Sequence, residues 1–108
     1  MTYDKVFDTL GDSTRRRIVE ILSHGPRSVA EIASRLPVSR PAVSQHLRLL
    51  LGSGLVSRMP LGQRNVYSLK PEGFEQVRRY VDFLWDDALA SFRETAVRSH
   101  NRKEKDNE

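Results

Sequence analysis

A predicted helix at residues 40–51 carries one face that holds neither core residues nor acids. Successive residues of an α-helix lie about 100° apart around its axis, which brings four side chains into one sector: Pro41, Ser44, Gln45 and Arg48. Arginine can bridge O6 and N7 of guanine, glutamine can bridge N6 and N7 of adenine, and serine can donate or accept a hydrogen bond. No carboxylate on this face would repel phosphate. The face therefore has the chemistry of a helix that enters the major groove of double-stranded DNA.

The residues around this face agree with that interpretation. Ser39 is of a type that caps helix N-termini, and Arg40 follows it at the end where a recognition helix reaches base edges first. The other side of the helix is predicted to face the protein through these residues: Ala42, Val43, His46, Leu47, Leu49, Leu50 and Leu51. We therefore assign DNA contact to Ser39 and Arg40 together with the four residues above.

The charges of the chain are distributed unevenly along the sequence. The chain has 108 residues and a net charge of +4, yet the segment 32–71 contains no Asp or Glu. An even spread of the acidic residues would place about five of them there. The same segment holds six basic residues: Arg35, Arg40, Arg48, Arg58, Arg64 and Lys70. A basic block of this kind is typical of a surface that faces a polyanion.

A β-hairpin is predicted directly after the helix at 40–51. We expect strands at 55–59 and 64–69, joined by a turn at 60–63, because Val and Tyr favour strands and Pro and Gly favour turns. Arginine is favoured where such a hairpin reaches the minor groove or the backbone. Three hairpin residues are therefore assigned to DNA contact: Arg58, Gln63 and Arg64.

The remaining segments are predicted to form helices. We expect them at the following positions: 3–10, 13–23, 29–35 and 72–97. Ser28 and Glu31 have the spacing of a capping box, in which each side chain accepts from the other residue's backbone N–H. Pro37 ends the short helix, and a tight turn leads to Ser39. This order predicts a mostly α fold with a small β-hairpin, namely a winged helix-turn-helix.

The long helix at 72–97 offers more apolar surface than one small domain can cover. Its apolar side chains recur three and four residues apart, and a chain of this length often gains core by dimerising. We therefore predict a homodimer, and six residues of the helix are assigned to its interface: Phe74, Val77, Val81, Leu84, Trp85 and Phe92.

The overall composition limits the remaining possibilities. We expect one domain over residues 1–97, followed by a disordered polar tail at 98–108. The chain has no cysteine, which excludes disulfides and thiolate metal sites. No signal peptide or membrane-length apolar segment is recognised in the sequence. The sequence therefore predicts a cytoplasmic protein that does not bind membranes.

Three segments of the chain resemble the arsenical-resistance-regulator family of winged-helix repressors. They are LGDSTRRRIVEIL at 10–22, SVAEIASRLPVSRPAVSQHLRLLLGSGLV at 28–56 and VYSLKPEG at 66–73. The resemblance implies homodimers whose first and last helices pack across a two-fold axis, which adds Val6, Phe7 and Leu10 to the interface. It also implies repression of an operator with dyad symmetry, and contacts through these residues: Arg40, Pro41, Ser44, Gln45 and Arg48.

The chain departs from the metal-sensing members of this family. Many of them hold a thiolate site at the start of the short helix, where this chain has Ser-Val-Ala-Glu at 28–31. Others bind zinc through histidines and carboxylates on the terminal helix, but residues 72–97 contain no histidine. Asp82, Asp86 and Asp87 alone make a poor transition-metal site. We therefore expect no metal and no cofactor, which leaves the effector open.

Two other classes of function fit the sequence less well. An enzyme is not predicted, because the sequence has no phosphate loop, nucleophile elbow or His-Glu metal pattern and so no catalytic residue. A winged helix that binds only protein remains an alternative, because fold does not fix function, although it would have no reason to exclude acids from residues 32–71. A metal-responsive repressor with an unrecognised site is a further alternative. The sequence does not identify the operator or the regulated genes.

Overall fold

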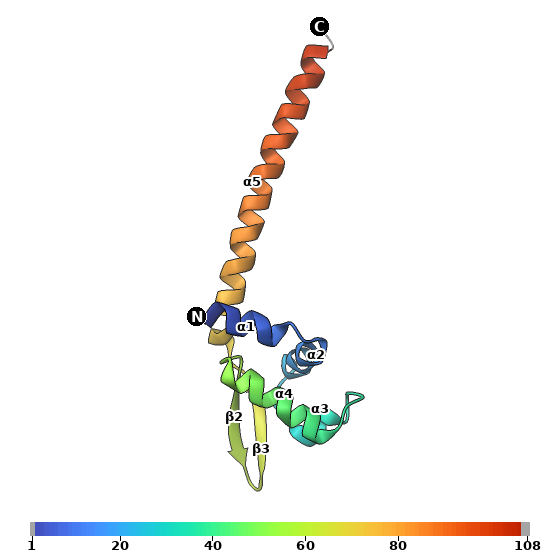
Figure 1. The fold of residues 1–108 in the computed structure, drawn as a ribbon, viewed down its shortest axis with the longest axis vertical. Coiled ribbons are helices and arrows are strands. Elements are labelled where there is room, and N and C mark those ends of the chain that lie inside the picture. The colour runs from blue at the N-terminus through green and yellow to red at the C-terminus, as the bar shows by residue number, and fades with distance from the viewer. Residues whose placement is uncertain (1, 107–108) are drawn as a thin grey trace. The chain divides into compact units, whose positions relative to one another are not determined.

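A computed structural model describes residues 2–106 of the chain (Figure 1). It is mostly helical with one small antiparallel sheet, as predicted. The elements follow in this order: α1 (Thr2–Leu10), α2 (Ser13–Leu22), β1 (Arg27–Ser28), α3 (Val29–Ala33), α4 (Arg40–Gly52), β2 (Val56–Leu61), β3 (Arg64–Leu69), the 3₁₀ turn η1 (Pro71–Phe74) and α5 (Glu75–Asp106). The chain divides into two compact units after Val77, and each unit is described by itself.

The helices of the first unit begin where side-chain oxygens can accept their free backbone N–H groups. Asp12 caps α2, since its Oδ1 accepts from the Arg15 amide at 3.0 Å. The predicted capping box is present: Ser28 Oγ accepts from the Glu31 amide, and Glu31 Oε1 accepts from the Ser28 amide at 3.1 Å. Ser39 Oγ accepts from the Ala42 amide at 3.3 Å and starts α4. These caps satisfy groups that have no partner within the helix.

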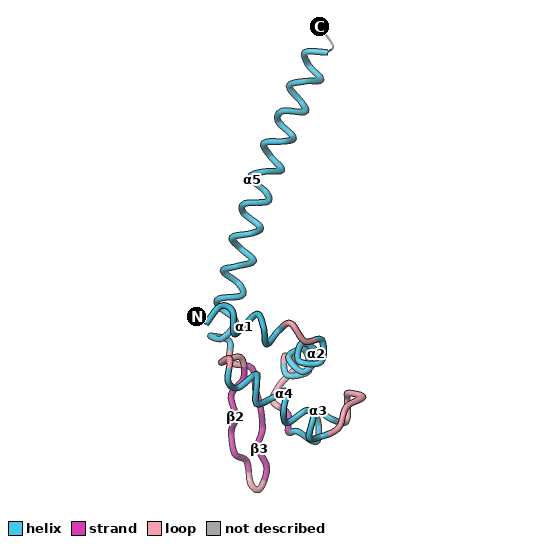
Figure 2. The backbone as a smooth tube through the Cα atoms, viewed as in Figure 1, coloured by secondary structure: helices cyan, strands magenta, loops and turns pink. Residues whose placement is uncertain are grey.

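The sheet has three strands in the order β1-β3-β2, and Figure 2 shows the hairpin of β2 and β3. The sequence did not predict the two-residue strand β1, which pairs Ser28 with Val66. The predicted turn at 60–63 was too long, because Pro60 and Leu61 belong to the edge strand β2, where proline is tolerated. The loop is only two residues, and Gly62 has the positive φ of 65° that such a tight hairpin needs at its first position.

The core of the first unit is closed around α2, α3, α4 and the sheet. Its buried side chains are Val6, Ile18, Leu22, Ile32, Val43, Leu47, Leu50, Leu55, Val56 and Tyr67. Gly73 lets η1 approach the chain after α4, because a Cβ there would overlap the carbonyl oxygen of Gly54. The prediction that Leu49 is buried is wrong, since 47% of it is exposed. It lies on the flank of α4, outside the narrow stripe that a surface helix buries.

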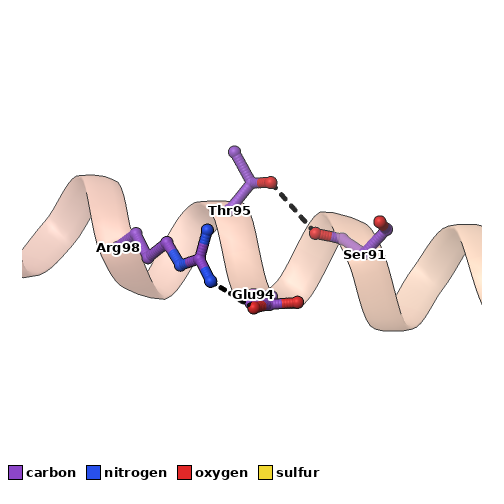
Figure 3. A network of polar contacts seen from close by, with 4 residues as sticks. All are labelled: Ser91, Glu94, Thr95 and Arg98. Atoms are coloured by element: carbon purple, nitrogen blue, oxygen red, sulfur yellow. Dashed lines mark hydrogen bonds and ion pairs between the residues drawn. The ribbon is translucent and has the colours of Figure 1, made fainter.

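Helix α5 is longer than predicted. It runs to Asp106 rather than ending near residue 97, through residues that were expected to be disordered; residues 107 and 108 lie outside the described part. The ion pair of Arg98 with Glu94, one turn apart, supports the helix, and the Thr95 hydroxyl donates to the Ser91 carbonyl nearby (Figure 3). Within 2–106, no helix has the combination of length and apolar character that spanning a membrane requires.

Candidate nucleic-acid interface

The polar face of α4 is open to solvent. Arg40, Pro41, Gln45 and Arg48 are exposed, and Ser44 is half-buried. Ser39 is exposed and uses its hydroxyl to cap the helix. The opposite side of the helix is closed, because Val43, Leu47 and Leu50 are fully buried. The core thus fixes the orientation of α4, and every DNA-contact residue predicted on this helix lies outside that core.

The β2–β3 hairpin presents its predicted contact residues on two different faces. Arg58, Gln63 and Arg64 are all exposed, and Gln63 lies in the two-residue turn between β2 and β3. Figure 1 shows this turn at the end of the hairpin. Arg64 is paired with Leu61, whereas Arg58 is paired with Tyr67. Because side chains alternate along a strand, this register puts Arg58 and Arg64 on opposite faces. The two arginines are therefore directed at different surroundings.

The arginines at the start of α2 are used within the protein. Arg15 donates from Nε to the Thr9 carbonyl at 2.6 Å, and its Nη1 lies 3.3 Å from Nδ1 of His46. Arg16 donates from Nη1 to the Leu10 carbonyl at 2.8 Å. Both side chains satisfy carbonyls at the C-terminus of α1, where positive charge is favourable. His46 is half-buried and connects α4 with α2, which agrees with its predicted position on the protein side.

Two carboxylates near the interface are committed to helix caps. The hydrogen bonds from Ser28 hold the pKa of Glu31 below its usual value, with a smaller contribution from the charges of Arg64 and Arg27. The Arg15 amide lowers the pKa of Asp12 in the same way, supported by the charges of Arg15 and His46. Hydrogen bonds to the ionised form favour ionisation. Glu31, the last acid before the acid-free segment, is therefore held at the start of α3 by the Ser28 amide.

A cavity connects the start of α4 with the hairpin. It has a volume of about 310 Å³ and is lined by Ser28, Val29, Ala30, Arg40, Arg64 and Asn65. The sequence analysis selected Arg40 and Arg64 separately and did not place them together. It also missed Asn65 and the start of α3. Strand β1 pairs with β3 and brings the start of α3 beside the hairpin. The sequence analysis missed this because a two-residue strand is too short to show a residue pattern.

The residues predicted for the dimer interface fall into two groups. Val6 is buried in the core of the first unit, and Leu10, Phe74 and Val77 pack against that core, so these side chains have little free surface. Phe7 is half-buried. The remaining residues of α5 are largely exposed, with 64% for Trp85 and 70% for Phe92, together with Val81 and Leu84. The structure adds three exposed apolar residues on α5 that the prediction omitted: Tyr80, Phe83 and Val97.

In the described part of the chain, no group of three or more His, Cys, Asp or Glu side chains is arranged to hold a metal ion. The polar residues gathered on the surface are instead mostly cationic or neutral hydrogen-bond donors. Such a set binds an extended anion better than it supports acid–base or metal chemistry.

Comparison with known proteins agrees with the geometry. The model of the arsR family of bacterial regulatory proteins matches residues 12–58. The chain is 49% identical to an HTH-type transcriptional regulator of Mycobacterium tuberculosis, over 82% of this chain and 83% of the relative. It is 35% identical to a transcriptional repressor of Bacillus subtilis, over 61% of this chain and 73% of the relative. A homodimeric winged helix-turn-helix DNA-binding domain from Mycobacterium bovis, a possible ArsR-family regulator, superimposes with a TM-score of 0.66 at 26% identity, covering 82% of each chain.

Proposed function

The chain belongs to the arsR family of bacterial transcriptional regulators, and on that premise we propose that it represses transcription as a homodimer bound to an operator with dyad symmetry. Each protomer inserts α4 into the major groove and lays its hairpin along the neighbouring backbone. The contacts that we propose are made by Ser39, Arg40, Pro41, Ser44, Gln45, Arg48, Arg58, Gln63 and Arg64.

The open face of α4 is the observation that supports this proposal most strongly. Gln45 and Arg48 are exposed next to each other along a helix whose other side is fixed by buried Val43 and Leu47. A rigid helix with exposed bidentate donors is what direct readout of base edges requires. The acid-free segment 32–71 surrounds this face, so a polyanion can approach it without repulsion from the chain's own carboxylates.

The homodimer rests on the exposed apolar side of α5 and on the homodimeric relative from Mycobacterium bovis. Val81, Leu84, Trp85 and Phe92 are the residues that we propose for its centre. A dimer doubles the recognition surface and presents two α4 helices to one side of the duplex. The two half-sites should therefore lie about one helical turn apart, or a multiple of it.

The proposal extends to the properties that distinguish this chain within its family. We propose that it acts in the cytoplasm, catalyses no reaction and responds to a signal other than a metal ion. The absence of cysteine from the sequence and of histidine from residues 72–97 supports metal independence. The alternative of a module that binds only protein is not favoured, because the relatives are transcriptional regulators.

A footprint of the purified protein on its own genomic DNA tests the proposed function. The expected result is protection of discrete sites with two inverted half-sites, at protein concentrations where a scrambled duplex stays free. Uniform weak protection along the DNA would contradict sequence-specific binding. Protection of single sites without symmetry, by a protein that sediments as a monomer, would contradict the dimer.

A further inference from the structure

Arg40 and Arg64 come from different elements but line the same cavity. Arg40 is the first residue of α4, and Arg64 is the first residue of β3. Side chains of a helix lean toward its N-terminus, so Arg40 extends back from α4 toward the space in front of the helix. The start of α3 and the hairpin border that space and supply the other lining residues. The two arginines therefore border one opening rather than two.

The cavity has the chemistry that binds a sugar–phosphate unit. No acid lines it, and its polar lining residues are Arg40, Arg64, Asn65 and Ser28. Val29 and Ala30 add an apolar wall, which suits the carbon atoms of a deoxyribose. Guanidinium groups bind phosphate oxygens through paired N–H donors. Two arginines at one opening are better placed to bind one phosphodiester group together than to contact two separate base edges.

The nearest acid does not cancel these charges. Glu31 follows the wall residue Ala30 in the chain, and its carboxylate accepts the Ser28 amide at 3.1 Å. The charges of Arg64 and Arg27 both act on this carboxylate. One carboxylate beside the two arginines, Arg40 and Arg64, leaves the opening with a net positive charge.

We propose that Arg40 and Arg64 of one protomer clamp a single phosphate of the DNA backbone in this cavity, so that the recognition helix and the wing are fixed on the same strand. This inference rests on the proposed function, since it names a contact within the DNA interface. It also changes the role of Arg40, which the sequence alone had assigned to base edges. Base reading is then left to the second turn of α4, where Gln45 lies.

Methylphosphonate scanning tests the clamp directly. The probe is a duplex that the intact protein selects from a random library, with one phosphate at a time replaced by the neutral methylphosphonate. With the natural protein, several positions should weaken binding, because Arg48 also contacts a phosphate, and one of them in each half-site should be the clamped phosphate. Arg40→Ala and Arg64→Ala should both be less sensitive than the natural protein at that same position. Two variants that lose sensitivity at different phosphates, or at none, would overturn the clamp.

The salt dependence of binding gives a second, independent readout. Each neutralised phosphate contributes about 0.9 to the slope of log K against log salt. Because the remaining arginine still neutralises the shared phosphate, Arg40→Ala and Arg64→Ala should each reduce the slope by less than one per protomer, and the double variant should reduce it by about one. A reduction by about two in the double variant would show separate contacts. Arg58→Ala is the matched control, because Arg58 lies on the other face of the hairpin and its loss should leave the clamped position sensitive.

These outcomes separate the clamp from the proposed function. If the intact protein selects no duplex at all, the DNA-binding function fails and the clamp fails with it. If it selects a duplex but Arg40 and Arg64 act on different phosphates, only the clamp fails. Thermal unfolding of each variant, followed by circular dichroism, confirms that the exposed substitutions leave the protomer folded.

Discussion

Large apolar side chains are mostly buried in the unit up to Val77 and mostly exposed on helix α5 beyond it. In the first unit, six large apolar side chains are fully buried: Ile18, Ile32, Val43, Leu47, Leu50 and Leu55. On α5 beyond Val77, aromatic residues such as Phe83, Trp85 and Phe92 are more than 60% exposed. The first unit also exposes Leu49, Met59 and Leu61, but it has a closed core, whereas α5 buries none of its large apolar side chains within residues 78–98. Reading DNA and joining a partner are thus assigned to different parts of the chain.

The largest expected effect comes from removing core volume in the first unit. Leu47→Ala should lower the free energy of unfolding by about 2–5 kcal/mol, because it leaves a cavity behind α4. Leu49→Ala is the matched control on the same helix, and it should cost under about 1 kcal/mol because Leu49 is half exposed. Urea unfolding measures both. Equal losses would contradict the boundary that we draw between the core and the surface of α4.

A comparable truncation on α5 should weaken assembly rather than folding of the protomer. Trp85→Ala should cost about 2–4 kcal/mol of dimer stability if Trp85 is central to the interface, which raises the dissociation constant by about 30-fold to several hundredfold. Phe83→Ala is the control, because residues two apart do not share a helix face. Analytical ultracentrifugation gives both constants. A wild-type protein that is monomeric at micromolar concentration would refute the contrast between the two regions.

A smaller effect is expected at the start of α3. Ser28→Ala removes one half of the capping box and should cost about 0.5–2 kcal/mol of unfolding free energy. The loss should appear in the first unit, where the capping box lies. Chemical denaturation at fixed protein concentration measures the change. A variant as stable as the natural protein would show that the cap contributes nothing to this short helix.

Zinc should have no effect on either region. Addition of zinc, followed by a chelator, should leave the affinity for the selected duplex unchanged, because neither cysteine nor a histidine within 72–97 is available as a ligand. Anisotropy titrations with and without the metal measure this. A tenfold loss that the chelator reverses would reveal a metal site and would give α5 or the helix-turn-helix a sensing role.

The sequence was most informative where local chemistry decides the structure. The caps at Ser28 and Ser39 and the burial of Val43, Leu47 and Leu50 on α4 followed from residue type and spacing, and the structure confirms them, although Leu49 of the same predicted set is exposed. Long-range features could not be predicted in this way. Strand β1 depends on pairing with a segment nearly 40 residues away, and the shared cavity of Arg40 and Arg64 depends on that pairing. The extra length of α5 was missed because polar helices lack the apolar period that marks a helix.

The contrast between base reading and phosphate binding on α4 tests the central claim most directly. Binding titrations of Gln45→Ala and Arg48→Ala, on the selected duplex and on a scrambled one at several salt concentrations, measure it. Gln45→Ala should lose about 1–3 kcal/mol on the selected duplex only and relax preference at one base in each half-site. Arg48→Ala should weaken binding to both duplexes and lower the salt slope by about one per protomer. If neither substitution changes binding, α4 does not enter the groove and the account is wrong.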